Sequence, residues 1–292
     1  MPPPWPHGAR CAISFTMDNL GEAQAVHNKT WPAGKPTGQD PSVLQTLPRI
    51  LDILAKTTTT GKGGVRATYF AEAWSLATYP AAVASLQRAG HEVAWHGFQH
   101  EVWHALSPGD EQASFERSFA AAREAGVVYR GFRPPGGRIN GVRTVGLCGR
   151  LGVEYVSPLG EFGILPGGGD GDGDGAGDVV VLPFEWEAVD AFWYMDKFAG
   201  TRREHGVQGE GEGEGAPGPA EFRAWLLRRI GETKAEGGYM SILFHPFLTT
   251  DEEKMGLLEE VVGLLGRDDE VWCAPCGEVA GWVREHRAEF GF

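Results

Sequence analysis

The chain has 292 residues, of which 42% are hydrophobic, and its formal net charge is −13 at pH 7. A chain of this length can build one α/β barrel around a sizeable core, so we expect a single domain over residues 1–292. The acidic balance argues against nucleic acid and anionic membranes as partners, because both attract clustered lysine and arginine. A small-molecule or saccharide substrate fits this composition better.

The first ten residues are rich in proline and lack the basic and apolar segments of a secretory signal. The sequence also contains no apolar run of the length that spans a bilayer, so we expect a cytoplasmic protein. Four cysteines are too few and too scattered for a disulfide framework in a chain of this size. We interpret them as buried thiols, including the Cys-Ala-Pro-Cys pair at 273–276.

Short apolar runs alternate with helical patterns along the chain. The predicted strands are 11–16, 65–70, 92–95, 128–132, 153–156, 179–184, 239–244 and 271–274. The predicted helices are 41–56, 80–89, 108–125, 142–151, 220–236, 251–265 and 278–287. Helix 108–125 has the clearest signals, with Ser107 as a cap, Pro108 at the first helical position and Gly126 after its end. This alternation predicts an α/β fold whose parallel sheet is closed or nearly closed into a barrel.

Polar residues follow several of the predicted strands, where the functional side chains of such a barrel lie. These residues are Asp18, Asn19, His96, His100, Arg133, Asp190 and His245. The four-residue spacing of the first two histidines can aim two imidazoles at one metal ion. Because suitable groups follow so many strands, the pattern favours a metal-dependent hydrolase.

Each of these residues also has a structural interpretation that the pattern leaves open. Asp18 could cap the segment that follows it, and Arg133 could pair with a carboxylate to fix a loop. His245 could be a buried histidine bonded to the backbone, and Asp190 could be a solvated loop acid.

Four motifs resemble those of the NodB-homology polysaccharide deacetylases, also called carbohydrate esterase family 4. Thr16-Met17-Asp18-Asn19 is similar to the family's Thr-Phe-Asp-Asp motif, and His96-Gly97-Phe98-Gln99-His100 is similar to its His-x-x-x-His motif. Arg133-Pro134-Pro135-Gly136 is similar to Arg-Pro-Pro-Gly, and Ile242-Leu243-Phe244-His245 to Leu-x-Leu-x-His. The likeness runs over nearly the whole chain. It implies a distorted (β/α) barrel that hydrolyses a C–N bond of an amide.

Within that family, the chain most resembles the branch of bacterial peptidoglycan deacetylases and metal-independent allantoinases. The likeness lies in Gly90-His91-Glu92-Val93, in the histidine motif and in Leu182-Pro183-Phe184-Glu185-Trp186, which leads to Asp190. We expect Pro134, Trp186 and Asp190 to bind substrate. An indole such as that of Trp186 would suit stacking on a sugar or another ring.

The resemblance also implies a role for each motif residue. Asp18 would be the general base, His245 the general acid, and Arg133 the residue that holds the base and keeps it ionised. His96 and His100 would be ligands of a divalent metal, which we expect to be zinc. Such a metal polarises the amide carbonyl and lowers the pKa of its bound water, while the histidine protonates the departing amine.

The chain departs from the family at one metal ligand. The family's second aspartate falls on Asn19, which is neutral and a weaker ligand. Either Asn19 ligates through its amide oxygen, or Glu22 or another carboxylate replaces it, or the site works without metal. A register shifted by one residue would put Met17 at the base position, and we prefer the first register because Thr16 and Asp18 then match together.

Two segments stand apart in composition. Residues 167–178 are mainly glycine and aspartate, and residues 209–218 combine glycine and glutamate with proline, so we predict flexible acidic loops. The first resembles the start of an EF-hand loop, but Val181 stands where the bidentate glutamate belongs, which argues against calcium binding.

Three hypotheses about function follow. The first is a metal-assisted deacetylase that acts on an N-acetylated amino sugar or small amide. The second is a metal-independent, ring-opening amidohydrolase of the allantoinase type, in which Asn19 would be no handicap. The third is a barrel that has lost catalysis and serves as a ligand-binding protein. Chelator sensitivity would separate the two enzymes, and substitution of Asp18 or His245 would separate both from the binding protein.

Overall fold

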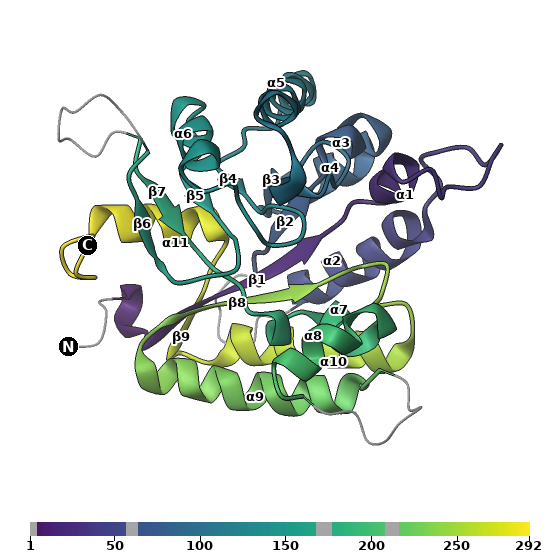
Figure 1. Ribbon diagram of the computed structural model, residues 1–292. Helices are drawn as coiled ribbons and strands as arrows, with labels where there is room; N and C mark the ends of the chain where they lie inside the picture. The colour runs from purple at the N-terminus through teal and green to yellow at the C-terminus, as the bar shows by residue number, and fades with distance from the viewer. Residues whose placement is uncertain (1–4, 57–63, 168–176, 208–215) are drawn as a thin grey trace.

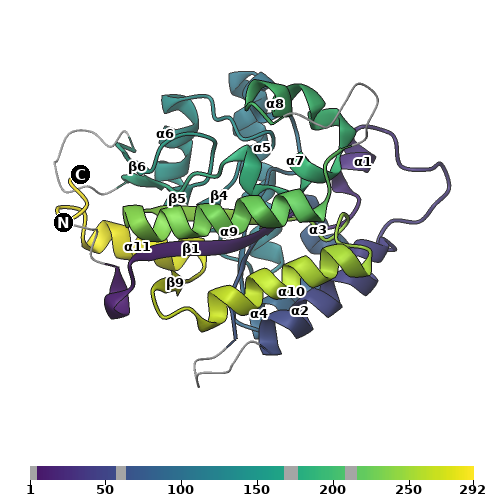
Figure 2. The same ribbon diagram turned by 90° about the horizontal axis from the view of Figure 1, so that it is seen from below.

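The computed structural model describes residues 5–56, 64–167, 177–207 and 216–292. A curled, mainly parallel sheet forms its centre, and most of the helices pack around the outside (Figures 1 and 2). The strand order is β6-β7-β5-β4-β3-β2-β1-β8, and β9 pairs with the amino-terminal half of β1. Among the described strands, only β6 and β7 pair in antiparallel fashion. The predicted α/β fold with a parallel sheet is thus confirmed.

The strands are β1 (Cys11–Asp18), β2 (Thr68–Ala71), β3 (Glu92–Trp95), β4 (Gly131–Phe132), β5 (Tyr155–Val156), β6 (Gly163–Leu165), β7 (Val179–Val181), β8 (Tyr239–Phe244) and β9 (Val271–Cys273). The helices are α1 (Ala23–His27), α2 (Leu47–Lys56), α3 (Ala73–Thr78), α4 (Pro80–Arg88), α5 (Pro108–Glu124), α6 (Val142–Arg150), α7 (Asp190–Tyr194), α8 (Ala199–Glu204), α9 (Pro219–Glu236), α10 (Glu252–Arg267) and α11 (Cys276–Glu285).

All eight predicted strands are present, but several are shorter than predicted. The strand predicted at 128–132 is only two residues long in the structure, as β4. Val128 is 82% exposed and lies outside the sheet. Strand 179–184 ends at Val181, and Pro183 just beyond it has no N–H for a ladder. The structure adds β6, a half-buried edge strand of three residues that is too short to give a periodic signal.

The seven predicted helices are also present, with one change of type. Helix 41–56 begins as a π-helical turn at Ser42–Thr46 before α2, where Pro48 removes an N–H from the α-helical pattern. The cap predicted for α5 is confirmed, since the Ser107 hydroxyl accepts a hydrogen bond from the Asp110 N–H at 3.2 Å. The sequence analysis missed four short helices, namely α1, α3, α7 and α8.

Successive side chains of β1 point to opposite faces of the sheet. One face packs against the helices and forms the outer core, and the other faces the interior of the barrel. One set of residues packs beneath the helices in the main hydrophobic cluster, and it consists of Cys11, Ile13, Phe15 and Met17. The other set has the opposite parity, and it consists of Ala12, Ser14, Thr16 and Asp18. The last residue of β1 therefore points its carboxylate into the curl of the sheet.

The curled sheet does not close completely. In the described part of the chain, β8 and the segment after β7 are joined through the isolated bridge between Val189 and Leu243. Helix α11 packs against β1, β5 and β7 and covers the amino-terminal end of the interior. Its first N–H groups donate to Thr68 Oγ1 and Glu92 Oε2, each at 2.8 Å. The interior is therefore accessible from the carboxyl-terminal end of the strands.

Other predictions about the chain have mixed outcomes. All four cysteines are free thiols, and three of them are buried while Cys273 is half-buried. Of the predicted acidic loops, 167–178 and 209–218, residues 168–176 and 209–215 lie outside the described residues. Among the described residues, no helix combines the length and hydrophobicity that crossing a bilayer requires.

The outer core makes a stability prediction. Trp95 is fully buried. The centroid of its ring lies 4.2 Å from that of Phe132 and 4.4 Å from that of Phe115. We expect Trp95→Ala to lower the free energy of unfolding by about 3–5 kcal/mol, because it removes these contacts and leaves a cavity. Val128→Ala, at an exposed site, should change it by less than about 0.5 kcal/mol. Equal effects in denaturant titrations of the two variants would contradict this description of the core.

Candidate active site

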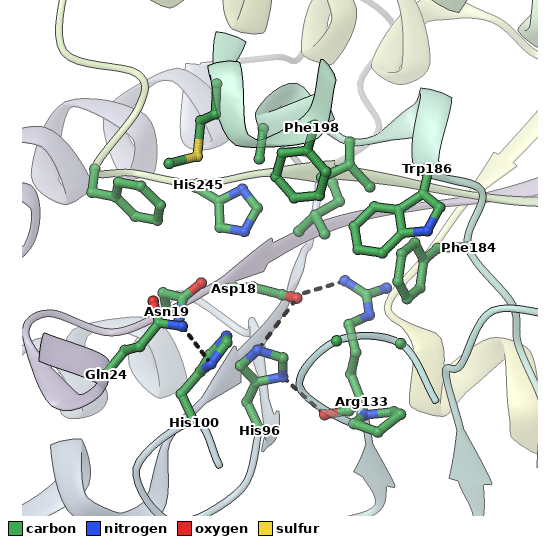
Figure 3. A pocket seen from close by; sticks show the side chains of 18 of the residues that line it. Asp18, Asn19, Gln24, His96, His100, Arg133, Phe184, Trp186, Phe198 and His245 are labelled. Atoms are coloured by element: carbon green, nitrogen blue, oxygen red, sulfur yellow. Dashed lines mark hydrogen bonds and ion pairs between the residues drawn. The ribbon is translucent and has the colours of Figure 1, made fainter. Parts of the chain in front are cut away.

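A pocket of about 260 Å³ opens at the carboxyl-terminal end of the barrel strands. Eight of the nine predicted site residues line it, and they are Asp18, Asn19, His96, His100, Arg133, Pro134, Trp186 and His245. Figure 3 shows His96 and His100 on one side of Asp18 and His245 on the other. The ninth residue, Asp190, lies behind His245 and is fully buried.

Strand geometry explains why these side chains meet. Asp18 is the last residue of β1, and Glu72, His96, Arg133 and His245 each follow directly after the end of a strand. In neighbouring parallel strands, the residues at the carboxyl ends reach the same edge of the sheet. The alternation of faces then turns this set inward, toward one space.

Asp18 is held by a buried ion pair. Its Oδ1 accepts a hydrogen bond from Arg133 Nη1 at 2.8 Å, and the side chains of both residues are almost completely buried. Its Oδ2 lies 3.8 Å from Nε2 of His96. One carboxylate oxygen is thus fixed, and the other points toward the histidine side of the pocket (Figure 3).

Arg133 makes further hydrogen bonds from the same guanidinium. Nη1 also donates to Thr16 Oγ1 at 2.9 Å, Nη2 donates to Ser241 Oγ at 2.8 Å, and Nη2 and Nε both donate to Ser157 Oγ. The group lies 4.1 Å from the ring centroid of Phe70, a cation–π distance. These partners come from four strands or their ends, so the guanidinium is fixed in place from several directions.

His96 and His100 are both neutral in this environment. Burial lowers the pKa of His96 to about 3 and that of His100 well below its usual value. Nδ1 of His96 donates to the Arg133 carbonyl at 2.8 Å, which leaves Nε2 with its lone pair toward Asp18. Nδ1 of His100 lies 2.9 Å from the side-chain amide of Gln24. Neutral imidazoles with one free nitrogen are the form that binds metal ions.

The sequence analysis missed Glu72, which completes a group of possible metal ligands. One ligand atom from each of Glu72, His96 and His100 lies within 4.8 Å of the others. Glu72 is fully buried, and burial raises its pKa to about 7 even though hydrogen bonds from the Leu20 N–H and Asn19 oppose the shift. An acidic residue directly after the second apolar run was the available signal, and the strand-end rule applied to that run would have found it.

Asn19 contacts Glu72 through its side chain. Its Nδ2 donates to Glu72 Oε1 at 2.7 Å, and the Leu20 N–H donates to Oε2 at 2.9 Å. Glu22, the named substitute for the missing aspartate, points elsewhere: it accepts hydrogen bonds from Tyr79 and from the Gly38 N–H. The third possible ligand beside the two histidines is therefore Glu72, which directly follows β2, and not a carboxylate of the segment after β1.

Two residues at the site have a left-handed backbone. Asn19 has a φ of 64° and His100 a φ of 65°, a conformation that costs energy for residues other than glycine. Such strain is common at functional sites, where the surrounding structure holds the residue in position. It turns both side chains toward the same pocket.

His245 and Asp190 form a second buried pair. Nδ1 of His245 lies 2.5 Å from Asp190 Oδ1, and the His245 N–H donates to Oδ2 at 2.7 Å. Burial disfavours protonation of His245, but the charge and the hydrogen bond of Asp190 outweigh it and raise the pKa above the usual value. For Asp190, which we predicted to bind substrate, this geometry favours positioning of His245 over direct contact with a ligand.

An aromatic wall borders the same pocket. Trp186 packs against Phe184 with a centroid distance of 5.5 Å and against Phe198 with 5.1 Å (Figure 3). By contrast, Trp95 and Trp103 are fully buried in the outer core and cannot stack on a ligand. Among the described tryptophans, Trp186 is the one that lines the pocket.

Comparisons with known proteins identify a family with a similar sequence and solved structures with a similar fold. The polysaccharide deacetylase family model matches residues 39–156, and no curated protein matches the sequence. A candidate polysaccharide deacetylase from Mycobacterium smegmatis is 27% identical with a TM-score of 0.78, over 98% of this chain and 94% of that one. One from Pseudomonas aeruginosa PAO1 is 20% identical with a TM-score of 0.70, over 98% and 95%.

The fold is also similar to that of Puue allantoinase, which is 18% identical with a TM-score of 0.73, over 98% of this chain and 94% of that one. The distorted (β/α) barrel predicted from the motifs is confirmed by these structures. The resemblance to the NodB-homology polysaccharide deacetylases that the four motifs predicted is thus confirmed by the family-model match over residues 39–156 and by the similarity of fold.

Proposed function

We propose that this protein hydrolyses the C–N bond of an amide with the help of a divalent metal, most simply as an N-deacetylase of an amino sugar or small amide. The observation that carries the proposal is the meeting of Asp18, His245 and the Glu72–His96–His100 cluster around one pocket. The relationship to polysaccharide deacetylases supports a hydrolase that acts on carbon–nitrogen bonds.

Asp18 is suited to act as the general base. Its ion pair with Arg133 places a permanent positive charge beside the carboxylate and fixes its orientation. Because Oδ1 is held by Arg133, Oδ2 is the atom that would remove a proton from the attacking water. Arg133 would act as a positioning residue that fixes the orientation of this carboxylate.

His245 is suited to act as the general acid. Asp190 raises its pKa and holds Nδ1, so the protonated ring would present Nε2 to the departing amine. The ring borders the pocket opposite His96 and His100 (Figure 3). Amide hydrolysis needs a base near the attacking water and an acid near the departing amine. Asp18 and His245 border the same pocket and could serve these two steps.

The donor set of the cluster fits a divalent cation such as zinc. One carboxylate and two neutral imidazoles form the ligand set of many catalytic zinc sites, which leave a further position open. Glu72, His96 and His100 would hold the ion, with Asn19 orienting the carboxylate of Glu72. When bound, the ion would polarise the amide carbonyl and lower the pKa of a water molecule.

A metal-independent amidohydrolase is the second candidate. The observation that favours it is that Asn19 and Leu20 donate to both oxygens of Glu72, and Gln24 contacts His100. These contacts satisfy both oxygens of Glu72 and one nitrogen of His100 without a cation. Incubation with a strong chelator separates the two candidates, because only the metal-assisted enzyme should lose activity and regain it when zinc is added back.

Metal binding should depend on Glu72. We expect Glu72→Gln to remove stoichiometric zinc binding and to lower kcat/KM for an N-acetylated substrate by at least about 100-fold. The matched control is Glu22→Gln, a buried glutamate outside the cluster, which should keep its zinc. Zinc retained in Glu72→Gln, measured by elemental analysis after dialysis, would rule out this ligand set.

Hydrolysis should depend on both acid–base residues. We expect Asp18→Asn and His245→Gln each to reduce kcat by about 10²–10⁴-fold with folding intact, because each removes one proton transfer. Assays of released acetate from N-acetylated amino sugars and small N-acetyl amides measure this effect. An undiminished rate in either variant would contradict the proposed mechanism.

The pH profile should depend on Asp190. Asp190 raises the pKa of His245, so the active protonated form extends to higher pH in the native protein. Asp190→Asn should lower that pKa, and the alkaline limb of kcat/KM should then move to lower pH. A profile with an unmoved alkaline limb would show that His245 is not the acid that this limb reports.

A further inference from the structure

The charges that border the pocket are almost all neutralised by the protein itself. Asp18 and Arg133 neutralise each other, and the remaining donors of the guanidinium bind Thr16, Ser157 and Ser241. His245 faces the buried carboxylate of Asp190.

Lys197 is the remaining charged side chain among the residues that line the pocket. It lies in the short turn Asp196–Phe198, and its Nζ is 5.2 Å from the ring centroid of Phe198. No described carboxylate forms an ion pair with it, and the adjacent Asp196 instead accepts a hydrogen bond from the Ala216 N–H at 3.1 Å. Lys197 is exposed, and desolvation lowers the pKa of its ammonium.

The surroundings of Lys197 define what else a ligand would contact. Phe198, the next residue, packs on Trp186, so the ammonium borders a flat apolar wall. Met195 and Phe247 add further apolar surface to the same pocket. A volume of about 260 Å³ is at the small end for ligand sites, so the part of a ligand held here is small.

We propose that the natural substrate is a small amide that carries an anionic group, and that Lys197 binds this group while the amide lies at Asp18 and His245. This specificity rests on the proposed amide hydrolysis in the same pocket. A carboxylate or a phosphate would each provide the anion, and the aromatic wall would contact the uncharged body of the substrate. Neutral amides would lack the charge contact with Lys197.

The test compares matched ligands that differ in charge. The carboxylate pair is N-acetylphenylalanine and its uncharged carboxamide, and the phosphate pair is N-acetylglucosamine 6-phosphate and N-acetylglucosamine. Equilibrium dissociation constants are measured by calorimetry at low ionic strength in a His245→Gln background, so that turnover does not obscure binding. We expect the anionic member of at least one pair to bind about fivefold tighter, with a preference that shrinks as salt rises.

Variants at position 197 then assign the preference to the lysine. Lys197→Gln should abolish it, and Lys197→Arg should retain it because the charge is kept. Lys56→Gln is the control, since Lys56 ends α2, which leads back to the start of β2 at the opposite end of the barrel. Thermal melts of each variant show that it is folded before its binding is compared.

The outcomes separate this inference from the proposed function. Equal binding of charged and neutral ligands in both pairs, or a preference that survives Lys197→Gln, overturns the role of Lys197. A preference that depends on Lys197, found in a protein that hydrolyses none of the four amides, supports anion binding and counts against amide hydrolysis. The pair that shows the larger preference identifies carboxylate or phosphate as the anion.

Discussion

The buried guanidinium of Arg133 is the constraint on which the interior of the barrel depends. A cation taken out of water needs a counter-charge and a partner for each N–H, or its burial would cost several kcal/mol. Asp18 supplies the charge, and Thr16, Ser157 and Ser241 supply the remaining acceptors. The interior is therefore polar around this guanidinium. The carboxylate that we propose as the base is fixed by the same contacts that make the buried arginine tolerable.

The site contains three buried carboxylates, and each has a different partner. Asp18 pairs with a permanent cation, Asp190 pairs with a histidine, and Glu72 accepts hydrogen bonds from neutral donors. An aspartate at position 19 would place a second negative charge against Glu72. Asn19 avoids that repulsion and donates to the glutamate instead, so the cluster keeps one carboxylate beside its two imidazoles.

The sequence predicted the parts of this site that follow from local pattern. Asp18, His96 and His245 each stand at the end of a clear apolar run, so a parallel barrel brings them together by topology alone. Glu72 was missed because the second run was ended at Phe70 and not at Ala71, so Glu72 did not directly follow it. The partnership of Asp190 with His245 joins residues 55 positions apart and depends on how the segment after β7 folds over β8. No pattern of residues near either one encodes that contact.

The placement of β1 has a consequence for how the chain reaches its native state. Residues 16–18 of β1 pair with β2, but residues 11–13 pair with β9 and most of the strand pairs with β8. The hydrogen bond from Thr16 to the Ile242 carbonyl spans 226 positions. During synthesis, β1 thus leaves the ribosome long before β8 and β9. The backbone groups that pair with these two strands stay unpaired until both have been made. Pairings of such long range slow folding, and until β8 and β9 are made they leave an apolar strand open to pairing with other chains.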